Sequence, residues 1–196
     1  MEMQIPIETH PWPPYMPPEP RLIMLGTFPP KPLRWSMEFF YPNPQNDMWR
    51  IMGEIFYGNK DEFWLTQRKA FDLEKIKSFL NEHGIALWDT AMRVRRLKDN
   101  ASDKFLEIVE CIDLPTLLDA HPTITSVVTT GEKATGVVAS IVNCELPRIG
   151  NPVHCSLGGH DFDLWRMPSS SRAYPLSMVK KAETYRKMFV SSGILK

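Results

Sequence analysis

The chain of 196 residues carries 23 basic and 23 acidic residues, and this balance gives no indication of a polyanionic partner. Its apolar content of 43% and aromatic content of 11% exclude a disordered chain and suffice for one sizeable core, so we expect a single domain over residues 1–196. The three cysteines are widely spaced and form no Cys-x-x-Cys pair, which argues against a disulfide framework, a zinc knuckle or an iron–sulfur cluster. We therefore expect neither a metal nor another cofactor.

No segment approaches the run of about 18 apolar residues that a membrane-spanning helix needs. The first residues also lack the basic segment followed by an apolar one that is typical of a secretory leader. The default expectation is a cytoplasmic monomer without a membrane partner.

The basic residues are unevenly distributed, however. Seven of them and a single acid, Glu183, lie between Leu164 and Lys196. These seven are Arg166, Arg172, Lys180, Lys181, Arg186, Lys187 and Lys196, and a second cluster comprises Arg93, Arg95, Arg96 and Lys98. Local basic patches on a neutral protein can bind phosphate, and the alternative for either cluster is an ordinary solvated helix face.

The first predicted element is a proline-rich, extended lead-in over residues 1–20. Twelve of the 18 prolines precede residue 45, and the pairs within the lead-in exclude a helix there. The aromatic residues Trp12 and Tyr15 indicate that the lead-in packs on the body of the protein.

Strands and helices then alternate along the chain. In order, we expect a strand at 22–25, a helix from Met48 to Phe56 that Asn46 caps, a helix at 72–83, a strand at 85–88, a short helix at 114–120, a strand at 124–129, a helix at 131–142, a strand at 162–167 and a last helix from Pro175. This alternation is typical of a mostly parallel sheet covered on both faces. We predict an α/β fold, namely a three-layer α/β/α sandwich around a central, mostly parallel four-stranded sheet.

Two loops at the carboxyl ends of predicted strands carry the chemistry. The first, Gly26–Pro30, leads into a rigid segment of aromatic and amide side chains, Tyr41–Trp49, that suits a planar heterocycle with a hydrogen-bonding edge. The second, Met167–Tyr174, offers serine hydroxyls, backbone N–H groups and Arg172 to an anion, although it also suits a simple helix cap. Strand ends meet at one edge of a parallel sheet, so both loops can form one cleft.

These two loops resemble the signature motifs of the uracil-DNA glycosylase superfamily, a Gly-x-x-Pro loop after the first strand and a Pro-Ser loop after the last. Residues 41–51 resemble the Pro-x-Asn segment of the mismatch-specific branch, with Pro44, Asn46 and Trp49 in matching places. The chain is more similar to the hypoxanthine-DNA glycosylase branch. That similarity includes His10-Pro11, residues 25–29, residues 84–89 and Gly131-x-Lys133-Ala134, and it is weakest over residues 93–112.

The resemblance implies a monofunctional DNA N-glycosylase of base-excision repair. Such an enzyme hydrolyses the N-glycosidic bond of a deaminated base, hypoxanthine or uracil, after flipping it out of DNA. The base-binding residues that it implies are Gly26, Thr27, Phe28, Pro29, Tyr41 and Asn43, with Phe28 or Tyr41 stacking on the base and Asn43 or Asn46 hydrogen-bonding to its edge. The DNA-binding residues that it implies are Ser169, Ser170, Ser171, Arg172, Tyr174 and Lys180.

The catalytic group is the point of departure from the family pattern. Phe28 stands where many members carry an acidic or amide residue that activates water, and Met167 stands where uracil-specific members have histidine. In the hypoxanthine branch the Asn of the Pro-x-Asn segment is implicated in catalysis, which carries over to Asn46 unless that residue is only a helix cap. An amide can orient water but cannot deprotonate it, so Asp89 or Asp47 is expected to assist a dissociative, oxocarbenium-like transition state.

Three hypotheses about function remain open on the sequence. The first is the glycosylase. The second is a catalytically weak or inactive protein of the same fold that binds damaged DNA, since the first loop lacks its acid. The third is an enzyme acting on free nucleosides or nucleotides, which the neutral net charge would suit.

Overall fold

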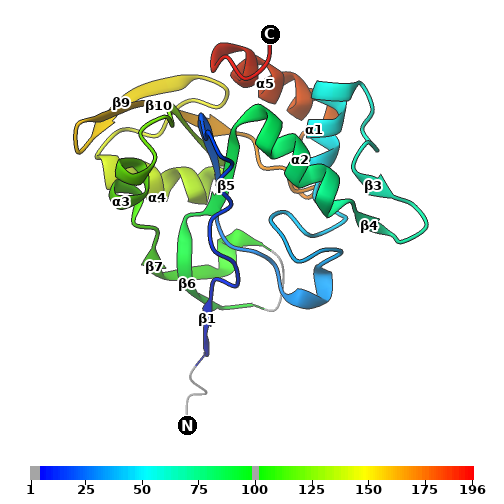
Figure 1. Ribbon diagram of the computed structural model, residues 1–196. Helices are drawn as coiled ribbons and strands as arrows, with labels where there is room; N and C mark the ends of the chain where they lie inside the picture. The colour runs from blue at the N-terminus through cyan, green and yellow to red at the C-terminus, as the bar shows by residue number, and fades with distance from the viewer. Residues whose placement is uncertain (1–4, 99–101) are drawn as a thin grey trace.

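The computed structural model describes residues 5–98 and 102–196, so the first four residues of the lead-in lie outside the described chain. Figure 1 shows the chain, and its central sheet has five strands. In spatial order they are β5 (Ile85–Asp89), β2 (Leu22–Gly26), β8 (Ser126–Thr130), β10 (His160–Met167) and β9 (Pro152–Leu157).

The first four of these strands are parallel, whereas β9 runs antiparallel to β10. The prediction of a four-stranded sheet was therefore wrong by one edge strand. The two glycines between β9 and β10, Gly158 and Gly159, both have positive φ, at 61° and 85°. This conformation makes the tight turn of a β-hairpin, so residues 152–157 fold back onto β10 instead of forming a loop.

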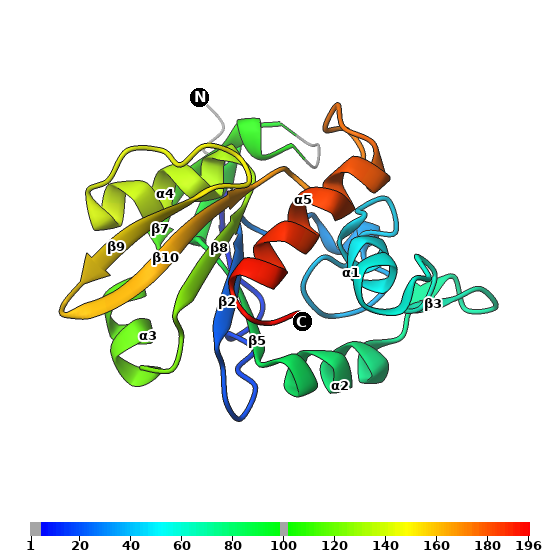
Figure 2. The ribbon, with the colours of Figure 1, turned by 90° about the horizontal axis from the view of Figure 1, so that it is seen from above.

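Helices cover both faces of the sheet, as the sequence predicts (Figure 2). Successive side chains of β2 point to opposite faces. Leu22 and Met24 pack with α1 (Met48–Tyr57), α2 (Leu73–His83) and α5 (Met178–Ser191). Ile23 and Leu25 pack with α3 (Leu114–Ala120) and α4 (Glu132–Val142). The result is a three-layer α/β/α arrangement.

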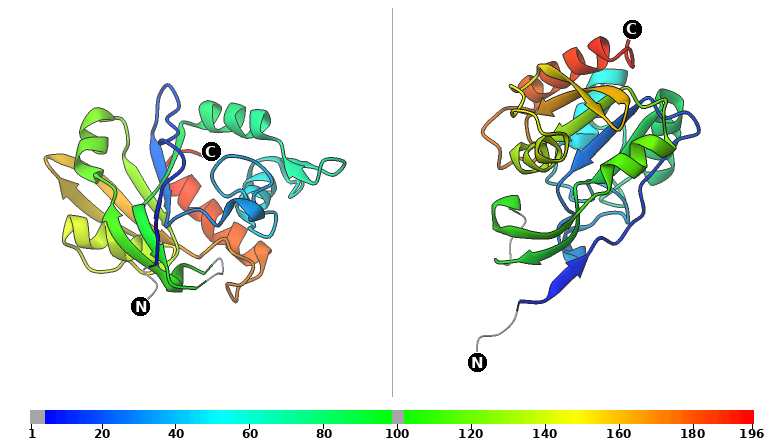
Figure 3. Two further views of the ribbon diagram at one scale, coloured as in Figure 1. Left: turned by 90° about the horizontal axis from the view of Figure 1, so that it is seen from below. Right: turned by 90° about the vertical axis from the view of Figure 1, so that its left-hand side faces the viewer.

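A second sheet, which the sequence did not predict, lies beside the first (Figure 3). It contains β1 (Ile7–Thr9), β6 (Ala91–Arg96) and β7 (Leu106–Cys111), all antiparallel, in the order β1-β6-β7. The smaller elements are a hairpin of β3 (Trp64–Leu65) and β4 (Ala70–Phe71) and two 3₁₀ turns, η1 (Pro32–Arg34) and η2 (Asp103–Phe105).

The basic cluster predicted around residue 95 lies on this second sheet. Its arginines are paired with carboxylates: Arg93 with Glu110, Arg95 with Glu107, and the buried Arg96 with Glu8. These ion pairs neutralise most of the cluster, so β6 is not a continuous basic surface.

The lead-in is extended along the molecule. Ile7–Thr9 form the edge strand β1, and Tyr15 makes two backbone hydrogen bonds with Leu87 of β5. The Trp12 ring packs against Trp35 with ring centroids 4.7 Å apart. Within the part of the chain that the structure describes, no helix is both long enough and apolar enough to cross a membrane.

Candidate active site

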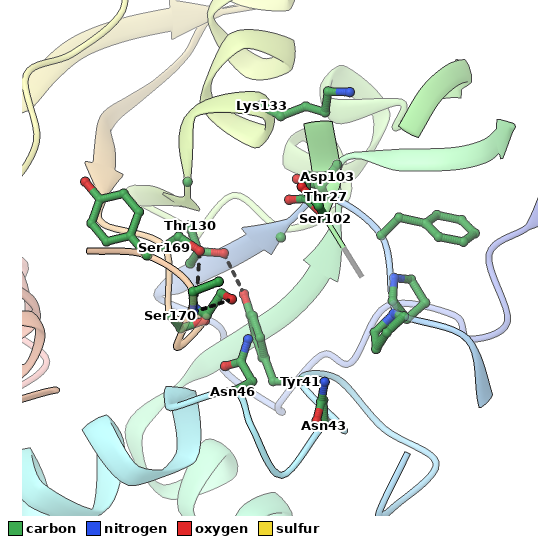
Figure 4. Close-up of a pocket in the computed structure, with 18 of the residues that line it drawn as sticks. Thr27, Tyr41, Asn43, Asn46, Ser102, Asp103, Thr130, Lys133, Ser169 and Ser170 are labelled. Carbon is green, nitrogen blue, oxygen red and sulfur yellow. Dashed lines mark hydrogen bonds between the residues drawn. The ribbon is translucent and has the colours of Figure 1, made fainter. Parts of the chain in front are cut away.

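A pocket of about 1090 Å³ opens at the carboxyl ends of the parallel strands (Figure 4). Every candidate site residue named from the sequence lines it, with two exceptions. Those lining it are Gly26, Thr27, Phe28, Pro29, Tyr41, Asn43, Asn46, Asp89, Ser169, Ser170, Ser171, Arg172 and Tyr174. The exceptions are Lys180, which lies exposed near the start of α5, and the buried Asp47, which lies behind the wall next to Asn46. The two strand-end loops therefore do meet in one cleft.

Gly26 ends β2 beneath the pocket, in contact with Asp89 at the end of β5. A Cβ atom at Gly26 would lie 2.4 Å from Oδ1 of Asp89, which explains why this position needs glycine. The other carboxylate oxygen of Asp89 accepts a 2.8 Å hydrogen bond from Nε2 of His10 in the lead-in. The side chains of Asp89 and His10 are only 9% and 3% exposed. The Asp89 carboxylate is therefore fixed in position by its contact with His10.

Tyr41 occupies the middle of the pocket wall in a strained backbone conformation. Its φ of 53° lies in the left-handed region, which residues other than glycine rarely adopt. The hydroxyl makes a 3.0 Å hydrogen bond with Oγ1 of Thr130, and the ring packs edge-on against Trp49. Burial, followed by the charge of Asp89, raises the pKa of Tyr41 above its usual range, so the phenol stays neutral. A neutral ring fixed in this way is suited to contact a planar base.

Asn43 and Asn46 form two consecutive turns at the pocket. The Asn43 side-chain oxygen accepts from the backbone N–H of Gln45, and that of Asn46 accepts from the N–H of Met48, both at 2.9 Å. The N-cap position of α1 is Asp47, so the prediction that Asn46 is the cap was wrong by one residue. The Asn46 oxygen nevertheless binds the first N–H of the helix, and its amide NH₂ group remains available as a donor. The helix contact and the site hypothesis for Asn46 are therefore compatible, because they use different atoms.

Phe28 lies half-buried between the pocket and the second sheet. Its ring packs edge-on against His10 at a centroid distance of 5.5 Å, and the Arg96 guanidinium lies 6.0 Å from the ring centroid. It also contacts the small apolar cluster of Ala91, Val94 and Leu106. Phe28 thus packs against this apolar cluster and also lines the pocket.

The Pro-Ser loop faces the pocket from the other side. Oγ of Ser169 accepts from the N–H of Ser171, and Oγ of Ser171 accepts from the N–H of Ala173. Their hydroxyl protons remain free to be donated to an anion. Ser170 is 2% exposed, so its side chain is less accessible to a DNA phosphate than the sequence suggested.

An ion network around two buried residues, which we call the Asp47 clamp, joins this loop to the Asn46 turn; its third member, Arg172, is exposed. It consists of Asp47, Arg172 and Lys181. Oδ1 of Asp47 accepts from Nε of Arg172 at 2.9 Å, and Oδ2 lies 3.4 Å from Nζ of Lys181, which also donates to the Ser171 carbonyl at 2.8 Å. Lys181 was predicted to belong to a basic surface patch, but it is fully buried. Asp47, held between two cations, is not positioned to act as a general base.

Sequence reasoning missed several residues of the pocket wall. Thr130 at the end of β8, Lys133 in α4 and Asp103 in η2 all line it. Asp103 comes from the region where the family resemblance is weakest. Thr130 directly follows a predicted strand, and its position at a strand end could have identified it as a candidate pocket residue.

Comparison with known proteins shows a similarity at the level of structure. No family model matches the sequence, and no curated protein sequence matches it. The structure resembles the solution NMR structure of a Methanosarcina acetivorans protein described as a "putative Uracil DNA glycosylase", with a TM-score of 0.65 and 21% sequence identity. The alignment covers 95% of this chain and 99% of the other. The two chains share a fold. At this identity, function has to be argued from the site itself.

Proposed function

We propose that the protein is a DNA N-glycosylase of the uracil-DNA glycosylase superfamily that removes a deaminated base. The observation that carries the proposal is the convergence of three segments on one pocket. These are the Gly26–Pro29 loop, the Tyr41–Asn46 segment and the Pro168–Tyr174 loop. The shared fold with a protein described as a uracil DNA glycosylase supports it independently.

The chemistry of the wall suits a flipped base. A base taken out of the helix needs a planar apolar contact and hydrogen-bonding groups for its edge. Tyr41 supplies a rigid ring, while the free NH₂ groups of Asn43 and Asn46 supply donors. Deaminated bases carry a carbonyl oxygen in place of an amino group, so two amide donors favour uracil or hypoxanthine over cytosine or adenine.

The rim suits a DNA backbone. Arg34 and Lys104 lie exposed at the pocket, and neither has a carboxylate within ion-pair distance among the described residues. The serine hydroxyls of the Pro-Ser loop add donors for a phosphate. A polyanion therefore fits this site although the whole chain has no net charge, which favours DNA over a free nucleoside.

The test uses labelled oligonucleotides that carry a single uracil, hypoxanthine or xanthine, in single and double strands, followed by alkali to cleave abasic sites. We expect cleavage at the modified position for at least one of these bases and none in an unmodified control. Binding without base release would instead support the alternative of an inactive protein that binds damaged DNA. That alternative is considered because Phe28 stands where many family members have an acidic residue. Absence of both binding and base release would refute the proposal.

Asn46→Asp is the sharpest variant for the Asn46 role. It keeps a side-chain oxygen that accepts from the Met48 N–H, so the turn that leads into α1 is preserved, but it removes the NH₂ donor. We expect a folded protein with base release reduced by about 100-fold, near the cost of one donor aimed at developing charge. Undiminished activity would remove Asn46 from the mechanism.

A further inference from the structure

Asp103 is a carboxylate of the pocket wall that the family motifs do not account for. It begins η2, the turn that leads from the end of β6 into β7. Leu106, next to this turn, is buried and paired with Arg96 in the second sheet, and Lys133 of α4 donates a hydrogen bond to the Leu106 carbonyl. These contacts fix η2 against the carboxyl end of the central sheet.

Thr27 lies beside Asp103 on the same side of the pocket (Figure 4). Its side-chain oxygen is buried and has no hydrogen-bond partner of good geometry among the described residues. The residue is only 4% exposed and lines the pocket. Thr27 lies close enough to Asp103 for its hydroxyl to lower the pKa of that carboxylate, and both residues line the pocket. A hydroxyl and a carboxylate placed side by side in this way can together bind one small polar molecule in the pocket.

The other carboxylates near the pocket are engaged elsewhere. Asp89 is paired with His10, and Asp47 is held in the Asp47 clamp. Glu132 lies largely exposed and is paired with Arg166. In contrast, Asp103 has no cationic group within 4.0 Å among residues 5–98 and 102–196.

We propose that Asp103, together with Thr27, binds the attacking water and takes its proton, supplying from the β6–β7 connection the acid that the first loop lacks at Phe28. The inference rests on the proposed glycosylase function and deepens it. The Asn46 amide offers a donor to the pocket, because its oxygen accepts from the Met48 N–H, and an amide is no base in any case, so the proton acceptor has to come from another residue.

In the reaction, the C1′–N bond of the flipped nucleotide breaks and its electron pair leaves with the base. The water oxygen forms the new bond to C1′, and the proton that the water loses goes to the Asp103 carboxylate. The departing base takes up a proton from solvent, and Asp103 later returns its own proton to solvent. The products are the free base and an abasic deoxyribose with a hydroxyl at C1′.

The surroundings of Asp103 set its protonation. Burial raises its pKa above the ordinary aspartate range, and the negative charge of Asp89 on β5 adds to this effect, although Asp89 is partnered by His10. The Thr27 hydroxyl, Lys133 on α4 and Arg96 on β6 act in the opposite direction. A carboxylate with a raised pKa is a stronger base than an ordinary one, which suits proton abstraction from water.

The experiment compares Asp103→Asn with the wild type and with Glu107→Gln, a control that neutralises an exposed carboxylate on β7 of the same connection. Single-turnover base release is measured from pH 4 to pH 9, on whichever oligonucleotide the wild type cleaves. Binding is measured separately on a duplex that carries a 2′-fluoro analogue of the excised nucleotide, which resists cleavage.

We expect Asp103→Asn to bind the analogue as the wild type does and to lose about 100-fold in rate, the usual contribution of a general base. The wild-type rate should rise with pH as Asp103 ionises. This rise at the acidic end of the pH–rate profile should be absent in the variant. Glu107→Gln should keep both the wild-type rate and its rise with pH.

A second readout does not depend on activity. Because the folded pKa of Asp103 is raised, the wild type loses stability as pH rises through the interval between the unfolded and the folded pKa. Asp103→Asn lacks this loss, so its melting temperature should exceed that of the wild type at pH 7. The difference should vanish below about pH 4, where the unfolded aspartate is also protonated.

Three results would overturn the inference. One is an Asp103→Asn rate within threefold of the wild type. Another is a wild-type rate that falls as Asp103 ionises, which would make it a general acid. The third is an unchanged pH dependence of melting in the variant. A wild type that releases no base from any oligonucleotide would instead refute the proposed function, and this inference with it.

Discussion

Replacing Lys181 by methionine tests whether the Asp47 clamp holds the two halves of the pocket together. The Lys181 side chain is 1% exposed, and its ammonium donates to the Ser171 carbonyl and lies 3.4 Å from Oδ2 of Asp47. Methionine keeps most of the apolar stem but removes both interactions. The Ser171 carbonyl loses a charge-assisted hydrogen bond, which costs about 1.5–3 kcal/mol.

Removing one partner of a buried ion pair costs about 3–5 kcal/mol when the other charge is left alone. Here Asp47 keeps Arg172 on its second oxygen, so we expect a total near the lower end, about 3 kcal/mol. For a chain of this size that corresponds to a fall in melting temperature of about 6–12 °C. The assay is urea denaturation of the wild type and the variant, with the midpoint and the slope compared.

The adjacent Lys180 provides the matched control, because it lies exposed in the same turn of α5. Lys180→Met should change the free energy of unfolding by less than about 0.5 kcal/mol. The double variant Asp47→Asn/Lys181→Met should cost less than the two single changes together, by about 1 kcal/mol or more. A loss in Lys181→Met no larger than in Lys180→Met, or strictly additive losses, would refute the clamp.

Three further predictions concern the pocket and the exposed lysine near it. Thr130→Val leaves the Tyr41 hydroxyl without its partner, so we expect a loss of about 1 kcal/mol in urea denaturation, and Thr130→Ser should restore most of it. Gly26→Ala drives a methyl group into the Asp89 carboxylate and should destabilise the protein by about 1–3 kcal/mol, whereas an unchanged unfolding midpoint would contradict the close contact. Lys180→Ala should reduce the salt dependence of DNA binding by about one ion if this exposed lysine meets a phosphate, and a constant slope would remove it from the interface.

The features that the sequence predicted well are those encoded locally. A Gly-Pro turn or a Pro-Ser turn directly after an apolar strand indicates a strand-end loop, and parallel strands bring such loops to one edge. Gly26 and Ser169 could therefore be placed in one pocket from the sequence alone. Asn46 was harder, because the residue type alone does not show that its oxygen binds the Met48 N–H while its NH₂ group stays available at the pocket.

The features that were missed depend on contacts between distant segments. Lys181 lies among basic residues in the sequence. Its burial is explained only by its ion pair with Asp47, which lies 134 positions earlier in the chain. Asp103 stands among polar residues of alternating charge that suggest a solvated loop. The second sheet brings it to the pocket by pairing β6 with β7 and with β1 of the lead-in, and no short window of sequence encodes that arrangement.

The position of β10 inside the sheet has a consequence for how this site comes into being. β10 lies between β8 and β9 although it follows both along the chain, and α5 then packs on α1, about 130 residues earlier. During synthesis, β8 keeps an unpaired apolar edge until residues 160–167 have left the ribosome, and such an edge invites aggregation. The Pro-Ser loop and the Asp47 clamp can form only after that step. The strand-end pocket is thus completed late in biogenesis, and a partly made chain would expose its sheet before the pocket exists.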